Sequence, residues 1–262
     1  MDFPGVALIT GAGSGIGQQT SILYAKEGCQ RLTIADINST ALEHTQQLIN
    51  SVAPAAQVLV RACDVSKEEE VEAMVDETVT RFGRIDYCAN VAGISLLGPP
   101  TDQIATALFD RDQNINLRGL FFCERAELRA MLKQEPDSRY TARGSIVNVS
   151  SMAGLVGLGD LPVYSASKHG VVGLSKADGM HYGQHGIRVN TVCPGAINTP
   201  ILQNSGNAVG VKPLTSPDAI QNALGRFGDP QEVAEALVWI TSHRASYITA
   251  AVLAVNGGQI GA

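Results

Sequence analysis

The chain has 262 residues, of which 45% are hydrophobic and 17% charged, and this size and balance predict one domain with a sizeable core. The formal net charge of -6, without a cluster of Lys or Arg, argues against a nucleic-acid surface, and no apolar run reaches the roughly 18 residues of a membrane span. The five cysteines form no CxxC pair, which argues against a disulfide framework or a zinc ribbon and predicts a reduced, cytoplasmic location.

Short apolar runs alternate along the chain with amphipathic stretches that suit helices. The apolar runs are continuous, so each strand is expected to be covered on both faces. This pattern predicts an α/β fold, with a doubly wound parallel sheet between helical layers and residues 1–262 in a single domain. Strands are predicted at 6–10, 31–36, 57–64, 85–93, 145–151, 187–195 and 251–258, with helices that include 18–27, 39–50, 67–82 and 231–242.

Glycines cluster where the first predicted strand meets the first helix. The run TGAGSGIG at 10–17 lets the backbone turn sharply and leaves N–H groups free at the helix start, where the helix dipole also favours negative charge. A turn without a ligand is the alternative, but a position between a strand and a helix favours nucleotide binding. We therefore expect a pyrophosphate to bind here.

Asp36 closes the second predicted strand, about 20 residues beyond the glycine turn, where an acid can accept hydrogen bonds from the adenosine ribose. A carboxylate at this position repels a 2′-phosphate, and residues 37–39 offer no arginine to bind one. The sequence therefore predicts NAD(H) rather than NADP(H). The alternative is that Asp36 caps the helix that begins near Ser39.

Residues 164–168 read YSASK, which places a tyrosine and a lysine on one face of a helix. A free phenol has a pKa near 10, and a neighbouring ammonium group lowers that pKa. The spacing therefore suits an acid/base pair but does not by itself indicate one. Helix geometry alone also brings such side chains together, so the pair has a purely structural alternative.

Two segments interrupt the alternation of strands and helices. The polar segment 133–144 contains Pro136 and is expected to be a surface loop. The segment 200–228 is rich in Gly, Pro, Asn and Ser and is too long for a simple connection, so it is expected to be a lid over a ligand.

Taken in order, these motifs resemble the short-chain dehydrogenase/reductase family of the single-domain type, and the resemblance covers essentially the whole chain. The glycines follow the spacing TGxxxGxG, and CANVAG at 88–93 is similar to the family's NNAG segment, with Val91 as the departure. Ser151 precedes Tyr164 by the usual separation. The resemblance implies a Rossmann-type fold with three αβα layers.

The resemblance also implies four catalytic residues. Tyr164 would exchange a proton with the substrate, and both Lys168 and the positive nicotinamide would favour its phenolate form. Ser151 would donate a hydrogen bond to the substrate oxygen, whereas its neighbour Ser150 is expected to pack against the backbone. Asn116, within NINLRG, would hold a water that connects the lysine to solvent.

The remaining motifs imply where the cofactor binds. The acid-apolar pair 64–65 would meet the adenine ring, the segment 90–93 would pass the ribose, and the turn 194–199 would hold the carboxamide. No metal site is expected. The expected cofactor-binding residues are Gly11, Ser14, Gly15, Ile16, Gly17, Asp36, Ile37, Asp64, Val65, Asn90, Ala92, Gly93, Tyr164, Lys168, Pro194, Gly195, Ile197 and Thr199.

The resulting expectation is an NAD-dependent enzyme that interconverts a secondary alcohol and a ketone. The apolar residues between 201 and 214 indicate a moderately apolar substrate, cyclic or polyketide-like. Two alternatives stay open: an NAD-binding sensor or scaffold on the same fold, and a redox-neutral epimerase or cyclase. A homotetramer is expected from the family, with a homodimer as the alternative, although alanines at 250–251 stand where the family commonly has glycine.

Overall fold

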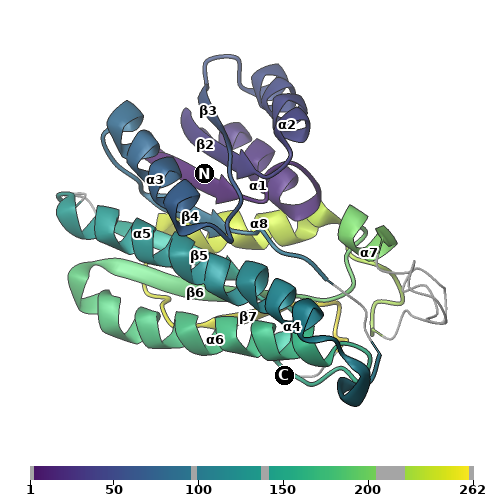
Figure 1. Ribbon diagram of the computed structural model, residues 1–262. Coiled ribbons are helices and arrows are strands. Elements are labelled where there is room, and N and C mark those ends of the chain that lie inside the picture. The colour runs from purple at the N-terminus through teal and green to yellow at the C-terminus, as the bar shows by residue number, and fades with distance from the viewer. Residues whose placement is uncertain (1–2, 96–98, 137–141, 205–221, 260–262) are drawn as a thin grey trace.

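The computed structural model describes residues 3–95, 99–136, 142–204 and 222–259 (Figure 1). Within these ranges seven parallel strands form one sheet in the order β3-β2-β1-β4-β5-β6-β7. The strand order reverses between β1 and β4, and the carboxyl ends of the strands on either side of such a reversal open a crevice for a ligand. The strands are β1 (Val6–Thr10), β2 (Arg31–Asp36), β3 (Gln57–Ala62), β4 (Tyr87–Asn90), β5 (Gly144–Val149), β6 (Ile187–Pro194) and β7 (Val252–Val255).

Two layers of helices cover the sheet (Figure 1). Helices α1, α2 and α8 bury their apolar sides against one face, and α3, α5 and α6 pack on the other. The expected three-layer α/β fold is therefore confirmed. The helices are α1 (Gly15–Lys26), α2 (Ser39–Val52), α3 (Glu68–Phe82), α4 (Thr106–Gln113), α5 (Leu120–Lys133), α6 (Pro162–Tyr182), α7 (Pro200–Asn204) and α8 (Pro230–Thr241), with a π-helical turn (Asn114–Gly119) between α4 and α5.

Strands β1 and β2 have the predicted bounds, whereas most of the others end earlier than predicted. The predicted strand 85–93 is the clearest case, because β4 ends at Asn90 and the next residues turn away from the sheet. Residues 91–95 are only partly buried, whereas β4 itself is fully buried, but their apolar side chains continue the run, so hydrophobicity alone could not mark the boundary. The lid expected at 200–228 begins with α7, and its residues 205–221 lie outside the described part, as do residues 137–141 of the polar segment.

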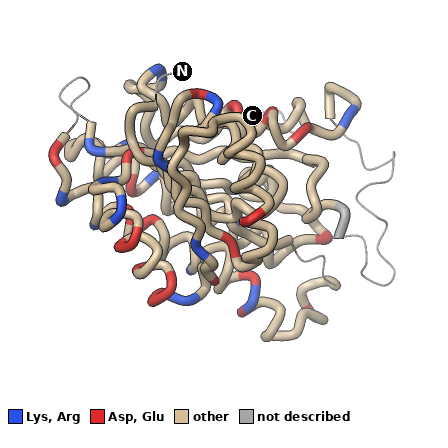
Figure 2. The backbone as a smooth tube through the Cα atoms, turned by 90° about the horizontal axis from the view of Figure 1, so that it is seen from above, with Lys and Arg blue, Asp and Glu red and all other residues tan. Residues whose placement is uncertain are grey.

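Charged residues lie mostly on the outer helices, with both signs interspersed, and the central strands carry few of them (Figure 2). In the described ranges no helix has the length and apolar character needed to cross a membrane.

A buried polar chain connects β4 and β5 to the helices on one face of the sheet. The Asn90 amide donates to Glu127 Oε2 at 2.9 Å and to Asn148 Oδ1 at 3.0 Å, and the Asn148 amide donates to Ser175 Oγ at 2.8 Å. All four side chains are almost fully buried. Burial raises the pKa of the Glu127 carboxyl to about 7, and the Asn90 hydrogen bond offsets part of that effect.

Replacing this acid with its amide should remove a pH-dependent cost. A carboxyl whose pKa is raised by folding contributes its full stability below its unfolded pKa, and that contribution is lost as the pH rises through the folded value, here about 7. Glu127→Gln should therefore gain stability over the parent protein between about pH 5 and pH 8, by on the order of 1 kcal/mol or more. Urea unfolding across this pH range measures the gain.

The exposed Glu43 on α2 provides the matched control, because Glu43→Gln removes the same charge at the surface. The free energy of unfolding of Glu43→Gln should differ from that of the parent protein by the same small amount at every pH. A constant offset between Glu127→Gln and the parent over the whole range would contradict the assignment of a raised pKa to Glu127.

Candidate active site

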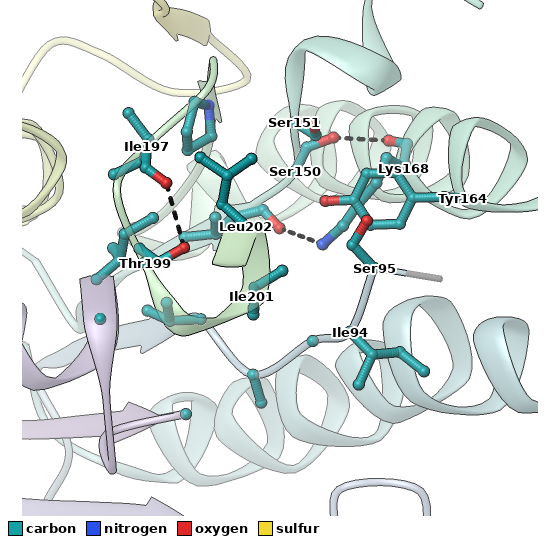
Figure 3. Close-up of a pocket in the computed structure, with 18 of the residues that line it drawn as sticks. Ile94, Ser95, Ser150, Ser151, Tyr164, Lys168, Ile197, Thr199, Ile201 and Leu202 are labelled. Carbon is teal, nitrogen blue, oxygen red and sulfur yellow. Dashed lines mark hydrogen bonds between the residues drawn. The ribbon is translucent and has the colours of Figure 1, made fainter. Parts of the chain in front are cut away.

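A cavity of about 910 Å³ lies at the carboxyl ends of the strands. Its walls come from the segments that follow β1, β2, β3, β4, β5 and β6, together with α7 (Figure 3). One end is formed by the glycine turn after β1 and the other by the start of α6. This is the crevice that the strand order predicts.

The glycine turn has a backbone that side chains would disrupt. Gly11 and Gly15 have φ angles of +68° and +52°, in the left-handed region that favours glycine. A Cβ on Gly17 would lie 2.1 Å from the carbonyl oxygen of Gly11. The turn therefore needs glycine for its own geometry, and it leaves the start of α1 bare toward the cavity, as a pyrophosphate site requires.

Asp36 is held at the end of β2 by two backbone donors. Its Oδ2 accepts from the N–H of Gly13 at 3.0 Å, and its Oδ1 accepts from the N–H of Asn38 at 2.9 Å. The cap of α2 is Asn38, whose side chain accepts from the N–H of Ala41 at 3.1 Å, so the alternative that Asp36 caps this helix is wrong. The carboxylate lines the cavity beside the glycine turn.

The tyrosine and the lysine lie at the opposite end of the cavity, on α6 (Figure 3). Lys168 Nζ lies 5.6 Å from the centre of the Tyr164 ring and donates to the Val149 carbonyl oxygen at 3.0 Å. The hydroxyl of Ser151, just beyond β5, lies near enough to Tyr164 to lower the pKa of its phenol. The structure thus brings together three of the four side chains that the family resemblance singles out.

Ser150 has a different environment from Ser151. Its hydroxyl is buried and donates to the backbone carbonyl of Lys168 at 2.8 Å. A Cβ on Gly154 would lie 2.3 Å from the Ser150 hydroxyl, so the chain passes very close at this point. The expectation that Ser150 serves backbone packing is confirmed.

The pKa values of Tyr164 and Lys168 are both shifted by burial. Burial raises the pKa of Tyr164 to about 12, with the nearby Ser151 hydroxyl opposing the shift and the charge of Asp112 adding to it. Burial lowers the pKa of Lys168 to about 8. The prediction that Lys168 and the nicotinamide together favour the phenolate concerns the cofactor-bound site, whereas in the chain by itself burial is the largest influence on both pKa values.

Two of the predicted site residues do not line the cavity. Asn90 belongs to the buried polar chain described above. Asn116 is fully buried in the π-helical turn, where its side chain accepts from the N–H of Ile94 at 2.8 Å and donates to the Ile94 carbonyl at 2.9 Å. It still lies close to the lysine, because a Cβ on Gly93 would lie 3.0 Å from Asn116 Oδ1 and 3.5 Å from Lys168 Nζ.

The other predicted cofactor residues all line the cavity. They group by the strand that they follow, so the carboxyl edge of the sheet brings distant motifs together. These residues are Gly11, Ser14, Gly15, Ile16 and Gly17 after β1, Asp36 and Ile37 at β2, Asp64 and Val65 after β3, Ala92 and Gly93 after β4, and Pro194, Gly195, Ile197 and Thr199 at β6.

Sequence reasoning missed most of the residues around the tyrosine end. They occupy the stretch between Ser151 and Tyr164 and the residues just after the 88–93 motif. Their position next to recognised motifs is the signal that could have identified them. The cavity residues missed in this way include Ile94, Ser95, Met152, Val156, Leu158, Asp160 and Leu161.

Cys193 precedes the turn at the end of β6 and is fully buried. Burial raises the pKa of its thiol, and the neighbouring Ser150 and Ser151 oppose the shift. A protonated, buried thiol is a poor nucleophile, as expected for a packing residue.

Comparison with known proteins agrees with the geometry. The family model described as enoyl-(acyl carrier protein) reductase matches residues 11–259. Levodione reductase of Leifsonia aquatica is 40% identical over 257 residues, which cover 97% of this chain and 93% of that protein. This chain belongs to the short-chain dehydrogenase/reductase family. The crystal structure of levodione reductase superposes with a TM-score of 0.92 at 39% identity, over 99% of this chain and 98% of that one.

Other members of the short-chain dehydrogenase/reductase family are nearly as similar. The 2,5-dichloro-2,5-cyclohexadiene-1,4-diol dehydrogenase of Sphingobium indicum is 37% identical over 96% of this chain and 95% of its own. The cyclohexanol dehydrogenase of an Acinetobacter species is 35% identical over 96% and 93%. These relatives are oxidoreductases that act on alcohol and ketone groups, and the family binds nicotinamide cofactors.

Proposed function

We propose that this chain is an NAD(H)-dependent oxidoreductase that interconverts a secondary alcohol and a ketone on an apolar ring. The observation that carries the proposal is the placement of the hydroxyls of Ser151 and Tyr164 in the cavity that also holds the glycine turn and Asp36. A hydride donor and a proton donor can therefore reach the same substrate carbon and oxygen.

The cofactor fits the residues that are present. The glycine turn would hold the pyrophosphate, Asp36 the adenosine ribose, and the turn from Pro194 to Thr199 the carboxamide of the nicotinamide. When bound, the nicotinamide supplies or accepts the hydride. The chain's own part is to orient the substrate oxygen between Ser151 and Tyr164 and to exchange its proton.

The direction of proton exchange follows from the raised pKa of Tyr164. A phenol with a pKa of about 12 is protonated at neutral pH, which is the form that donates a proton to a ketone. Ketone reduction should therefore proceed at neutral pH, and alcohol oxidation should increase as the solution becomes more alkaline.

The substrate end of the cavity favours an apolar, compact molecule. Aliphatic side chains of Ile201 and Leu202 lie across from the tyrosine side, and Ile94 lies below it (Figure 3). Relatives whose names specify cyclohexanol and a cyclohexadiene diol support a six-membered ring. We infer a cyclic ketone or alcohol of this size.

A non-catalytic sensor and a redox-neutral enzyme are the competing functions. Absorbance of the reduced cofactor distinguishes them, because only a net oxidoreductase consumes NADH in proportion to product. Steady turnover of NADH with cyclic ketones supports our proposal, and NADH binding without consumption across the panel favours the alternatives.

Removal of the tyrosine hydroxyl should abolish this turnover. Tyr164→Phe deletes the proton donor and leaves the ring in place, so kcat should fall by at least 100-fold while NADH still binds. Tyr182→Phe, on the same helix, is the control and should retain parental kcat. Retained activity in Tyr164→Phe would overturn the assignment of Tyr164.

Substitutions of the neighbouring serines 150 and 151 should affect different properties, one mainly stability and the other mainly activity. Ser151→Ala removes a hydroxyl from the cavity and should lower kcat about 100-fold with little change in unfolding midpoint. Ser150→Ala removes the hydrogen bond to the backbone of α6 and should cost about 1 kcal/mol of stability. Steady-state kinetics and urea unfolding of both variants test these two roles. Equal losses of activity in the two variants would contradict the assignment of a catalytic role to Ser151 alone.

Charge at Asp36 should decide the choice of cofactor. The parent protein should bind NADH at least tenfold more tightly than NADPH, and Asp36→Asn should reduce that ratio by about tenfold because the repulsion of a 2′-phosphate is lost. Fluorescence titration measures both affinities. Asp64→Asn, at the predicted adenine position, is the control and should weaken both cofactors by a similar factor.

A further inference from the structure

One buried acid beside the active site has no place in the function proposed so far. Asp112, in the last turn of α4, is only 1% exposed. Neither of its carboxylate oxygens has a hydrogen-bond partner among the described residues. An isolated carboxylate is costly to bury, so a compensating charge nearby is expected.

The fold places Asp112 next to the lysine of the active site. Asp112 precedes Asn116 by four residues on a continuous helical stretch, so the two side chains share one helix face. That face packs against α6, and Asn116 lies beside Lys168 at the Gly93 turn. The positive charge of Lys168 is near enough to lower the pKa of the Asp112 carboxyl, although burial raises that pKa more strongly.

The polar groups around Asp112 are already engaged with the backbone. The Ser167 hydroxyl donates to the Tyr164 carbonyl at 2.9 Å, and the Asn116 amide donates to the Ile94 carbonyl. Both lie near enough to lower the pKa of Asp112, although burial raises that pKa more strongly. Lys168 therefore remains as the group that can balance the carboxylate's charge.

Lys168 also needs a partner of opposite charge, because its own charge is costly to bury. Its ammonium group is buried and donates one hydrogen bond to the protein in the described structure, to the neutral carbonyl of Val149. Desolvation works against its charged form, and the negative charge of Asp112 works in favour of it. The two buried charges thus stabilise each other across the contact between α4 and α6.

We propose that Asp112 is a positioning residue that keeps Lys168 protonated inside the buried site and thereby sets the pH range in which Tyr164 can exchange a proton with substrate. This proposal deepens the proposed function and rests on it for its catalytic part. The charge of Asp112 also acts on Tyr164 and favours its protonated form. Cys193, from β6, also lies near Tyr164 and Lys168. Its buried thiol stays uncharged near neutral pH.

The sign of the effect follows directly. A negative charge raises the pKa of every acid or base nearby, so its removal lowers the pKa values of both Lys168 and Tyr164. Asp112→Asn keeps the shape of the side chain and removes the charge. The apparent pKa in the pH profile of kcat/KM should move down by about one unit, and alcohol oxidation should be reached at lower pH.

Asp110 supplies the matched control. It lies on the same helix, two residues earlier, and its side chain is exposed. Asp110→Asn removes an equal charge from the surface and should leave the pH profile unchanged. Asp112→Glu retains the charge and should restore most of the parental profile.

A second measurement does not depend on turnover. Lysines labelled with ¹³C at Cε report their own protonation by nuclear magnetic resonance, and Lys168→Arg identifies the signal of Lys168. In the cofactor-free parent protein this signal should titrate near pH 8. In Asp112→Asn it should titrate about one unit lower, and in Asp110→Asn at the parental pH.

The outcomes separate the two proposals. An unchanged lysine titration in folded Asp112→Asn overturns the pairing of Asp112 with Lys168. A shifted titration in a protein that consumes no NADH with any cyclic ketone supports the pairing and contradicts the proposed function. If Asp112→Asn does not fold, Asp112→Glu decides, because a parental titration supports charge pairing and a shift of a full unit contradicts it.

Discussion

A reciprocal pair of hydrogen bonds joins the end of β5 to the middle of α6, and the geometry of the site depends on it. The Lys168 ammonium donates to the Val149 carbonyl, while the Ser150 hydroxyl donates to the Lys168 carbonyl. Gly154 lies against this junction without room for a side chain. Because both partners are buried, the helix cannot slide along the strand, and Tyr164 is held in place one helical turn before Lys168.

The other end of the cavity is fixed by backbone rather than by side chains. Asp36 accepts from the N–H of Gly13, so the acid that would read the ribose also holds the turn that would bind the pyrophosphate. A Cβ on Gly13 would lie 2.9 Å from the Asp36 carboxylate. The position of the Asp36 carboxylate and the geometry of the turn are therefore coupled, and a change at either residue disturbs the other.

Much of the fold and of the cofactor end could be predicted from sequence, because each depends on local chemistry. Strands β1 and β2, the glycine turn and Asp36 follow from apolar runs, glycine spacing and the position of one acid. The protonation of Tyr164 could not be predicted in the same way. Spacing shows that Lys168 is close, but only the packed structure shows how far burial raises the pKa of Tyr164 and lowers that of Lys168. Asp112 was missed for a related reason, since nothing in a helical sequence marks one acid as buried.

The stretch between Ser151 and Tyr164 is anchored at both ends and contributes no strand to the sheet. Its two ends carry the hydroxyl groups of Ser151 and Tyr164, which line the cavity, and its middle supplies aliphatic side chains to the cavity wall. Residues at 157, 159 and 160 are exposed, so the middle of the stretch is only lightly tied to the core. Substitutions there can reshape the cavity without moving the reacting groups or unfolding the sheet. Evolution can therefore diversify the molecules that such a chain accepts while the cofactor and the chemistry stay constant.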